Sequence, residues 1–96
     1  MQDDEFEWDE RKAAANLRRH RVSFKAARRT FDDPFAIARA DRREDYGEAR
    51  YVITGMVGDR LLFVAYTMRE GRIRIIMARY AEPFERKLYH EENTKD

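Results

Sequence analysis

Three polar residues spaced four apart form the clearest chemical pattern in the sequence. They are Lys12, Asn16 and His20, and a helix beginning after Asp9 would align them in a stripe about 12 Å long, at about 1.5 Å rise per residue. Imidazole exchanges a proton near neutral pH, and RNA cleavage through the 2′-hydroxyl needs a base, an acid and cations around the phosphorane. The pattern suits phosphodiester chemistry. The alternative is a solvated helix face with His20 packed or capping near the helix end.

A second set of candidates comes from segments that would lie side by side in a sheet: Glu48, Arg50, Tyr66, Arg69, Arg72, Arg74 and Arg79. Arginines on a sheet face stabilise negative charge that develops on phosphate oxygens. Rings such as those of Trp8 and Tyr66 stack on unpaired bases. The alternatives are ordinary cross-strand charge pairing for Glu48 and Arg50 and a core position for Trp8.

Charge is unevenly distributed although the formal net charge is only +1. Residues 1–10 contain six acids and no base, whereas residues 11–30 contain eight bases and no acid. Blocks of one sign attract polyanions even when the whole chain is nearly neutral. Arginine outnumbers lysine sixteen to four, and guanidinium groups suit bidentate phosphate contacts, although a GC-rich genome would produce the same ratio.

Composition argues against several other classes. The absence of cysteine excludes disulfides and thiolate sites and favours a cytoplasmic location. We expect no metal, because His20 and His90 lie seventy positions apart and no carboxylate spacing resembles a ligand set. We expect no cofactor, because no glycine-rich phosphate loop is present. The longest apolar stretch, residues 61–66, is too short for a membrane span, and the acidic start is unlike a signal peptide.

The elements that must position these residues follow from the hydrophobic periodicity. A short strand is predicted over residues 3–8, a helix over 10–20 and a second helix after Ser23. After Pro34 the period becomes two, which predicts strands over 35–39, 50–57, 61–67 and 72–80, with turns at 58–59 and 70–71. In the last strand, Ile73, Ile75 and Met77 are expected on one face and Arg72, Arg74 and Ile76 on the other, while Arg79 follows a change of register.

Pro83 suits the first turn of a closing helix. We therefore expect a single α+β domain over residues 1–96, with a frayed tail at 91–96. Its two N-terminal helices and one C-terminal helix would pack against an antiparallel sheet of about four strands.

Several blocks recur in the order and spacing of a known family. The first half contains Phe6-Glu7-Trp8-Asp9, Lys12, Asn16, Arg19-His20, Val22-Ser23-Phe24 and Phe31-Asp32-Asp33-Pro34. The second half contains Glu48-Ala49-Arg50-Tyr51, Tyr66-Thr67-Met68-Arg69, Arg72-Ile73-Arg74-Ile75-Ile76-Met77-Ala78-Arg79 and Glu85-Arg86-Lys87-Leu88-Tyr89. Together, over about residues 6–89, these blocks resemble the BrnT toxins of bacterial type II toxin–antitoxin pairs.

The resemblance implies a RelE-like fold and an endoribonuclease that acts on RNA without a metal. It also implies a BrnA-like antitoxin that holds the toxin inactive and forms with it an autorepressing complex that binds operator DNA. The matching positions imply an active surface with Lys12, His20, Glu48, Arg50, Arg69, Arg74 and Arg79. Within it, His20 or Glu48 is expected to transfer the proton. Arg74, Arg79 and Lys12 are expected to stabilise phosphate charge.

The chain also departs from the family pattern. Arg21 follows His20 where the family usually has glycine, so a positive φ is expected to strain this turn. Met77 stands where the family commonly has serine, and residues 23–27 lack the usual glutamates.

Two other interpretations of the function remain open. One is a non-catalytic nucleic-acid-binding domain whose basic helices over 11–30 imitate a helix-turn-helix. The other is an interaction module that receives an acidic or amphipathic peptide.

Overall fold

The computed structural model describes residues 1–42 and 47–94, which form one sheet and three α-helices. The helices are α1 (Glu10–His20), α2 (Phe24–Arg28) and α3 (Pro83–Asn93), with a 3-10 turn, η1 (Arg29–Asp32), directly after α2. The strands are β1 (Phe6–Glu7), β2 (Ile37–Asp41), β3 (Arg50–Val57), β4 (Arg60–Arg69) and β5 (Arg72–Tyr80). The α+β class and the order of the elements are as expected from the sequence.

The sheet differs from the expected antiparallel sheet of about four strands. In the described residues it has five strands in the order β1-β5-β4-β3-β2, and β1 runs parallel to β5. The pairing joins Phe6 to Ile73 and Glu7 to Arg74. Parallel neighbours need a long connection, and here most of the chain lies between the two strands. Local periodicity therefore could not predict that β1 pairs with β5 at one edge of the sheet.

Side-chain caps set the ends of the helices. The Asp9 carboxylate accepts the amides of Arg11 and Lys12 at the start of α1, and the Ser23 hydroxyl accepts an amide at the start of α2. Arg21 ends α1 with φ 61° and donates its amide to the Leu17 carbonyl, as its place in the sequence led us to expect. Helix α3 continues to Asn93, so the tail predicted over 91–96 begins within the last turn of this helix.

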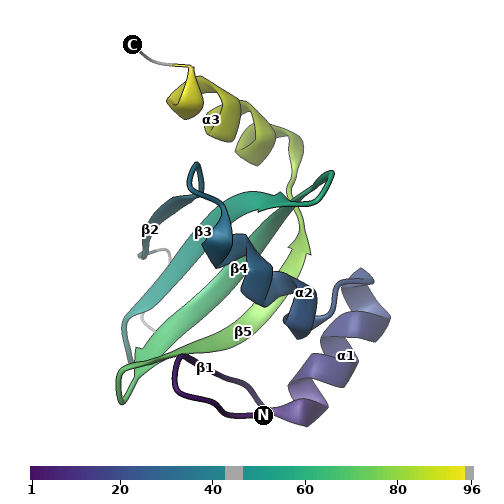
Figure 1. The fold of residues 1–96 in the computed structure, drawn as a ribbon, viewed down its shortest axis with the longest axis vertical. Coiled ribbons are helices and arrows are strands. Elements are labelled where there is room, and N and C mark those ends of the chain that lie inside the picture. Colours follow the sequence, from purple (N-terminus) through teal and green to yellow (C-terminus); the bar gives the residue numbers. More distant parts are fainter. Residues whose placement is uncertain (43–46, 95–96) are drawn as a thin grey trace.

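The helices cover the two faces of the sheet unequally. Helix α2 crosses one face and α1 lies beside β5, whereas α3 lies at the end of the sheet near the β3–β4 turn (Figure 1). The main core forms on the α2 side, where Phe24 and Ala27 meet Ile53, Val64 and Ile75. A smaller cluster beneath α3 contains Leu61, Met56 and Tyr89. Much of the second face is therefore left without a covering helix in the described structure.

A register shift in β5 decides which side chains lie on that second face. Ile75 pairs with Tyr66 and Met77 pairs with Ala65, so Ile76 is an extra residue between two regular pairs. Paired residues share a face and neighbours along a strand alternate. Met77 therefore lies on the face opposite Ile75. The expectation that it joins Ile73 and Ile75 was wrong, because the bulge reverses the alternation after Ile75.

Candidate functional site

The second face of the sheet gathers six arginines from four strands. By strand register and alternation they are Arg39, Arg50, Arg69, Arg72, Arg74 and Arg79, and we call this surface the arginine face. Arg74 lies opposite Thr67 and Arg79 opposite Phe63. The structure thus places on one face all five strand arginines that the sequence singled out, Arg50, Arg69, Arg72, Arg74 and Arg79. It adds Arg39, which was not among the candidates.

Arg74 is held by an acid from the neighbouring strand. Its Nη1 donates to Oε2 of Glu7 at 2.6 Å across the β1–β5 pair, and the Glu7 side chain is only 12% exposed. Nη1 is one of several donors in the guanidinium fork, which carries five N–H groups. Sequence reasoning missed Glu7 as part of the site because its partner strand lies 67 positions away.

Arg79 donates more of the hydrogen bonds described here than Arg74 does. Its Nη1 and Nη2 donate to the two carboxylate oxygens of Glu85 at 2.8 and 2.9 Å, and Nη1 also donates to the Tyr80 carbonyl. The guanidinium carbon lies 4.1 Å from the centre of the Phe63 ring. The buried Glu85 carboxylate also accepts the Glu82 amide, which completes a capping box at the start of α3. In the sequence, Pro83 between Glu82 and Glu85 is typical of a capped helix start, and this pattern could have identified Glu85 as a buried capping residue.

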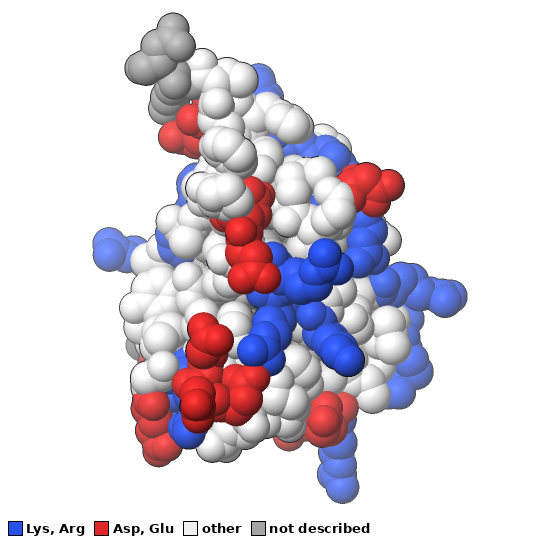
Figure 2. Space-filling view, in the orientation of Figure 1, with Lys and Arg blue, Asp and Glu red and all other residues white. Residues whose placement is uncertain are grey.

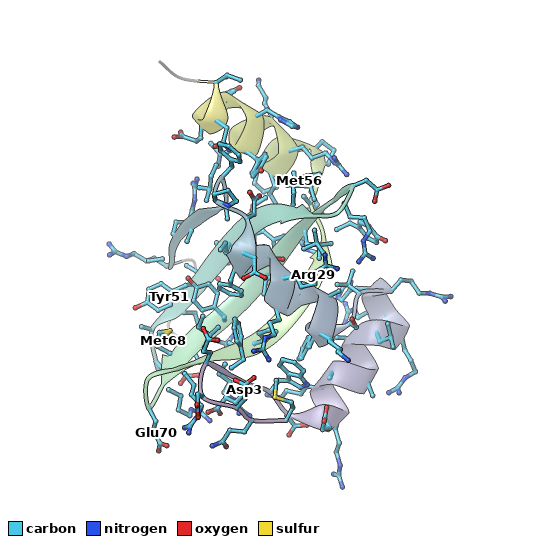
Figure 3. The ribbon with its side chains drawn as sticks, in the orientation of Figure 1. Asp3, Arg29, Tyr51, Met56, Met68 and Glu70 are labelled. Carbon is cyan, nitrogen blue, oxygen red and sulfur yellow. The ribbon has the colours of Figure 1, made fainter. Side chains whose placement is uncertain are left out.

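Glu48 lies beside Arg69, next to the start of β3. Its Oε2 is 3.5 Å from Arg69 Nη2, with both side chains more than a third exposed. The Thr67 hydroxyl donates to the Ala49 carbonyl at 2.6 Å and so ties this segment to β4. The pair lies toward the β4–β5 turn, which Glu70 marks at the opposite end of the molecule from Met56 and α3 (Figure 3). Glu48 is thus a solvent-accessible carboxylate next to an arginine.

The predicted polar stripe is present on α1, and Asn16 fixes it against the edge of β5. The Asn16 amide nitrogen donates to the carbonyls of Ala78 and Val22 at 2.8 and 2.9 Å, and its oxygen accepts the Ala78 amide at 3.1 Å. Asn16 thereby pairs with β5 as another strand would. Lys12 is exposed one turn before it and His20 is half-buried one turn after it.

Lys12 and Arg74 both act on the carboxylate of Asp9. The pKa of Asp9 is lowered by hydrogen bonds from the Lys12 and Arg11 amides, and the charges of Lys12 and Arg74 lower it further. Both cations therefore lie within electrostatic reach of one carboxylate. His20 lies at the other end of α1, before the strained Arg21. The structure brings Lys12 toward the arginine face and leaves His20 at the opposite end of that helix.

Neither predicted stacking residue lies on the arginine face. Trp8 is 8% exposed, packs edge-to-face on Phe24 and donates its indole N–H to Glu10. Tyr66 lies on the α2 side, where it stacks on Tyr51 with ring centres 5.5 Å apart. Burial, followed by the nearby Tyr51, raises the pKa of Tyr66. Both rings thus have structural contacts away from the arginines.

A separate set of bases lies on the helix side. Figure 2 shows basic side chains in the middle of the face that α2 crosses, with acidic side chains below them. We call Lys25, Arg28 and Arg29 the helix-side patch. Arg28 pairs with Asp3 at 2.6 Å, and the pKa of Asp3 falls to about 2 through hydrogen bonds from the Phe6 and Glu5 amides and then from Arg28. The helix-side patch and the arginine face thus lie on opposite sides of the sheet.

The described residues contain neither a metal-binding cluster of side chains nor a helix that could span a membrane. Within residues 1–42 and 47–94, no three His, Asp or Glu side chains gather closely enough to hold a metal ion. None of the helices in that part has the length and apolar character needed to cross a membrane.

The sequence also matches a known family over residues 8–85, described as the ribonuclease toxin BrnT of type II toxin–antitoxin systems. No curated protein matches the chain significantly. The matched region extends from Trp8 through α1, α2 and the strands that build the arginine face to Glu85. The chain therefore belongs to the BrnT family, the ribonuclease toxins of type II toxin–antitoxin systems.

Proposed function

We propose that the arginine face binds and cleaves RNA in the cytoplasm by acid–base chemistry that needs no metal ion. The observation that carries this proposal is the shared orientation of the strand arginines, which lie up to 40 positions apart in the sequence and on one face of the sheet. Guanidinium groups held by a rigid sheet stabilise the negative charge that grows on a phosphate during cleavage. A ribonuclease toxin requires such a surface.

Arg74 is the best placed phosphate ligand. Among the described contacts it gives one hydrogen bond to Glu7, whereas Arg79 gives two to Glu85 and one to the Tyr80 carbonyl. More donors of Arg74 therefore remain for phosphate oxygens. Lys12 adds positive charge near Arg74, and Arg79 adds charge at the other end of β5.

The proton-transfer group is Glu48 or His20. Glu48 is accessible and lies beside Arg69. An imidazole can both accept and donate a proton, and His20 lies at the end of the stripe that Asn16 holds against β5. Trp8 and Tyr66 have no part in this proposal, because their rings pack on other faces. The two candidates lie on different elements, so single variants separate them.

Cleavage of a labelled single-stranded RNA in the presence of EDTA tests the proposal. The wild-type toxin should cleave, and Arg74→Ala should lower the rate about 10²- to 10³-fold, the usual cost of losing one donor to the transition state. Either Glu48→Gln or His20→Gln should lower it about 10²- to 10⁴-fold. The matched control is Arg29→Ala, which removes an exposed arginine from the helix-side patch.

Two results would contradict this assignment. Loss of all wild-type activity in EDTA would refute the metal-independent mechanism. Full activity of Arg74→Ala with loss of activity in Arg29→Ala would move the site to the helix side. That side is the surface that a non-catalytic nucleic-acid binder would use, but α2 has only five residues, which is short for a helix that reads a major groove.

The antitoxin partner of this family is proposed to be BrnA-like and to cover basic surface of the toxin. The two candidate surfaces are the arginine face and the basic residues of the 11–30 segment, which include the helix-side patch. An antitoxin bound to either surface would neutralise positive charge that is needed to bind RNA. Operator DNA should bind only the toxin–antitoxin complex. A gel shift of operator DNA by the toxin alone, or an interface that leaves both surfaces exposed, would refute this part.

A further inference from the structure

A small pocket opens on the arginine face where α3 meets the sheet. Its volume is about 210 Å³, and its strand residues share the face with Arg79. The floor and walls are mostly apolar, and the main contributors are Val52, Phe63, Phe84 and Leu88. The pocket thus adjoins the surface proposed to hold the RNA backbone.

Phe84 is the unusual member of this pocket. It lies in the first turn of α3, and it is 66% exposed although it is aromatic. Its neighbour Glu85 is held by Arg79, which fixes the start of the helix. A ring held on a helix at the rim of an apolar floor provides a platform on which a flat aromatic ligand can stack.

The pocket also carries polar groups suited to the edge of such a ligand. Thr54 contributes a hydroxyl, which can donate to or accept from the edge of a base. The Glu85 carboxylate also lines the pocket, but its oxygens already accept from Arg79 and from the Glu82 amide. Arg39 and Arg42 line the pocket together with Asp41 at the end of β2. Two arginines beside an apolar slot match a ligand with a flat ring and a phosphate on each side.

We infer that this pocket binds one unpaired nucleobase of the RNA substrate and so determines which nucleotide lies next to the cleaved bond. The inference rests on the proposed function, because it extends the same face. Size supports a single base, since sites for whole drug-sized ligands begin at ~300 Å³. The groove between α1 and α2 is larger, about 660 Å³, and lies on the helix side, where Leu17 and Phe24 line it. That groove is better suited to a peptide segment.

A panel of RNA oligonucleotides that differ at one position tests the inference. Phe84→Ala should reduce the ratio of kcat/KM between an oligonucleotide with a base and one with an abasic residue at that position by about fivefold or more, because stacking on one ring contributes this much per base. Thr54→Val should also change the ranking of the bases. The matched control is Phe35→Ala, because Phe35 is 61% exposed and does not line the pocket. An unchanged ratio in Phe84→Ala would overturn the inference.

A titration that does not depend on cleavage keeps the two proposals separate. Each of the four nucleoside 5′-monophosphates is added to the wild-type toxin while its backbone amide resonances are recorded. We expect at least one to shift the amides of Val52, Thr54 and Phe63, and Phe84→Ala to abolish these shifts. Inorganic phosphate should not reproduce them. If the wild type cleaves no RNA, the proposed function fails, and the titration still decides whether the pocket takes a base.

Two titration outcomes count against the pocket. Shifts confined to the arginines, or equal shifts with inorganic phosphate, would show a phosphate contact and no base site. If Phe84→Ala weakens antitoxin binding and leaves both base discrimination and the nucleotide-induced shifts intact, the pocket is an antitoxin contact instead. Because Phe84 is exposed, its substitution should leave the folded state intact, and an unchanged circular dichroism spectrum checks this.

Discussion

Replacing Asn16 with alanine should lower the free energy of unfolding by about 3 kcal/mol. The substitution removes three buried hydrogen bonds, two to Ala78 and one to Val22. Each such bond contributes about 1 kcal/mol net, and a buried group left without a partner costs about 1–3 kcal/mol. The lower value for each of the three bonds gives a loss of about 3 kcal/mol. For a domain of this size, such a loss lowers the Tm by roughly 12–24 °C.

Urea unfolding followed by tryptophan fluorescence measures this loss. Trp8 is the single tryptophan and lies in the core against Phe24, so its emission reports the packing of the N-terminal segment. Lys12→Ala is the matched control, since Lys12 lies one turn earlier on the same stripe and is exposed; its effect should stay within about 0.5 kcal/mol. A loss below about 1 kcal/mol in Asn16→Ala would refute the structural assignment of Asn16.

Three further substitutions test local features. Burial and then the Asp33 hydrogen bond raise the pKa of Tyr89 to about 12. The protonated Tyr89 therefore stabilises the fold fully below about pH 10, and this contribution is lost as the pH rises through 12. Tyr89→Phe should abolish this loss of stability in alkaline unfolding curves. Arg21→Gly should raise the free energy of unfolding in urea by up to about 1 kcal/mol, because glycine adopts φ 61° without strain. Gly55→Ala should lower it by about 1–3 kcal/mol, because a Cβ would lie 3.0 Å from Thr30. An alkaline loss of stability that persists in Tyr89→Phe, or an unchanged free energy of unfolding in Arg21→Gly or Gly55→Ala, would contradict the corresponding argument.

Local signals predicted most elements of the fold. Asp9, Ser23 and Pro83 begin the helices where their side chains or ring geometry suggest, because capping depends on neighbours within one turn. Gly58 has φ 63° and Gly71 has φ 78°, as tight turns between strands require. Such features involve residues close in sequence, so a single sequence contains enough information to predict them.

Long-range pairings account for what the sequence did not predict. Glu7 meets Arg74 only because β1 joins the far edge of the sheet, and Asn16 meets Ala78 across 62 positions. The bulge at Ile76 is different, because a change of register before Arg79 was expected from the sequence and is confirmed. In a regular strand, Arg74 and Arg79 would face opposite sides because they are five residues apart. The bulge places them on one face, so the candidate site depends on this change of register.

The Arg79–Glu85 pair requires stability and catalysis to be measured separately. Arg79→Ala leaves the Glu85 carboxylate buried without its partner, and such a change costs about 3–5 kcal/mol. A loss of cleavage in this variant would therefore have two explanations, partial unfolding or a missing phosphate contact. The double variant Arg79→Ala/Glu85→Gln removes both charges, and its amide still reaches the Glu82 backbone N–H. It should recover most of the lost stability.

Comparing cleavage in the two variants then isolates the chemistry. If Arg79 stabilises the phosphate, the double variant should fold as the wild type does in urea titrations and yet cleave RNA about 10²-fold more slowly. If the double variant cleaves at the wild-type rate, Arg79 acts only by holding α3 on the sheet. Arg74 would then be the one arginine of β5 for which a phosphate contact remains proposed. Glu7→Gln provides the corresponding control, since it removes the charge that Arg74 faces at 2.6 Å while retaining an amide oxygen as acceptor.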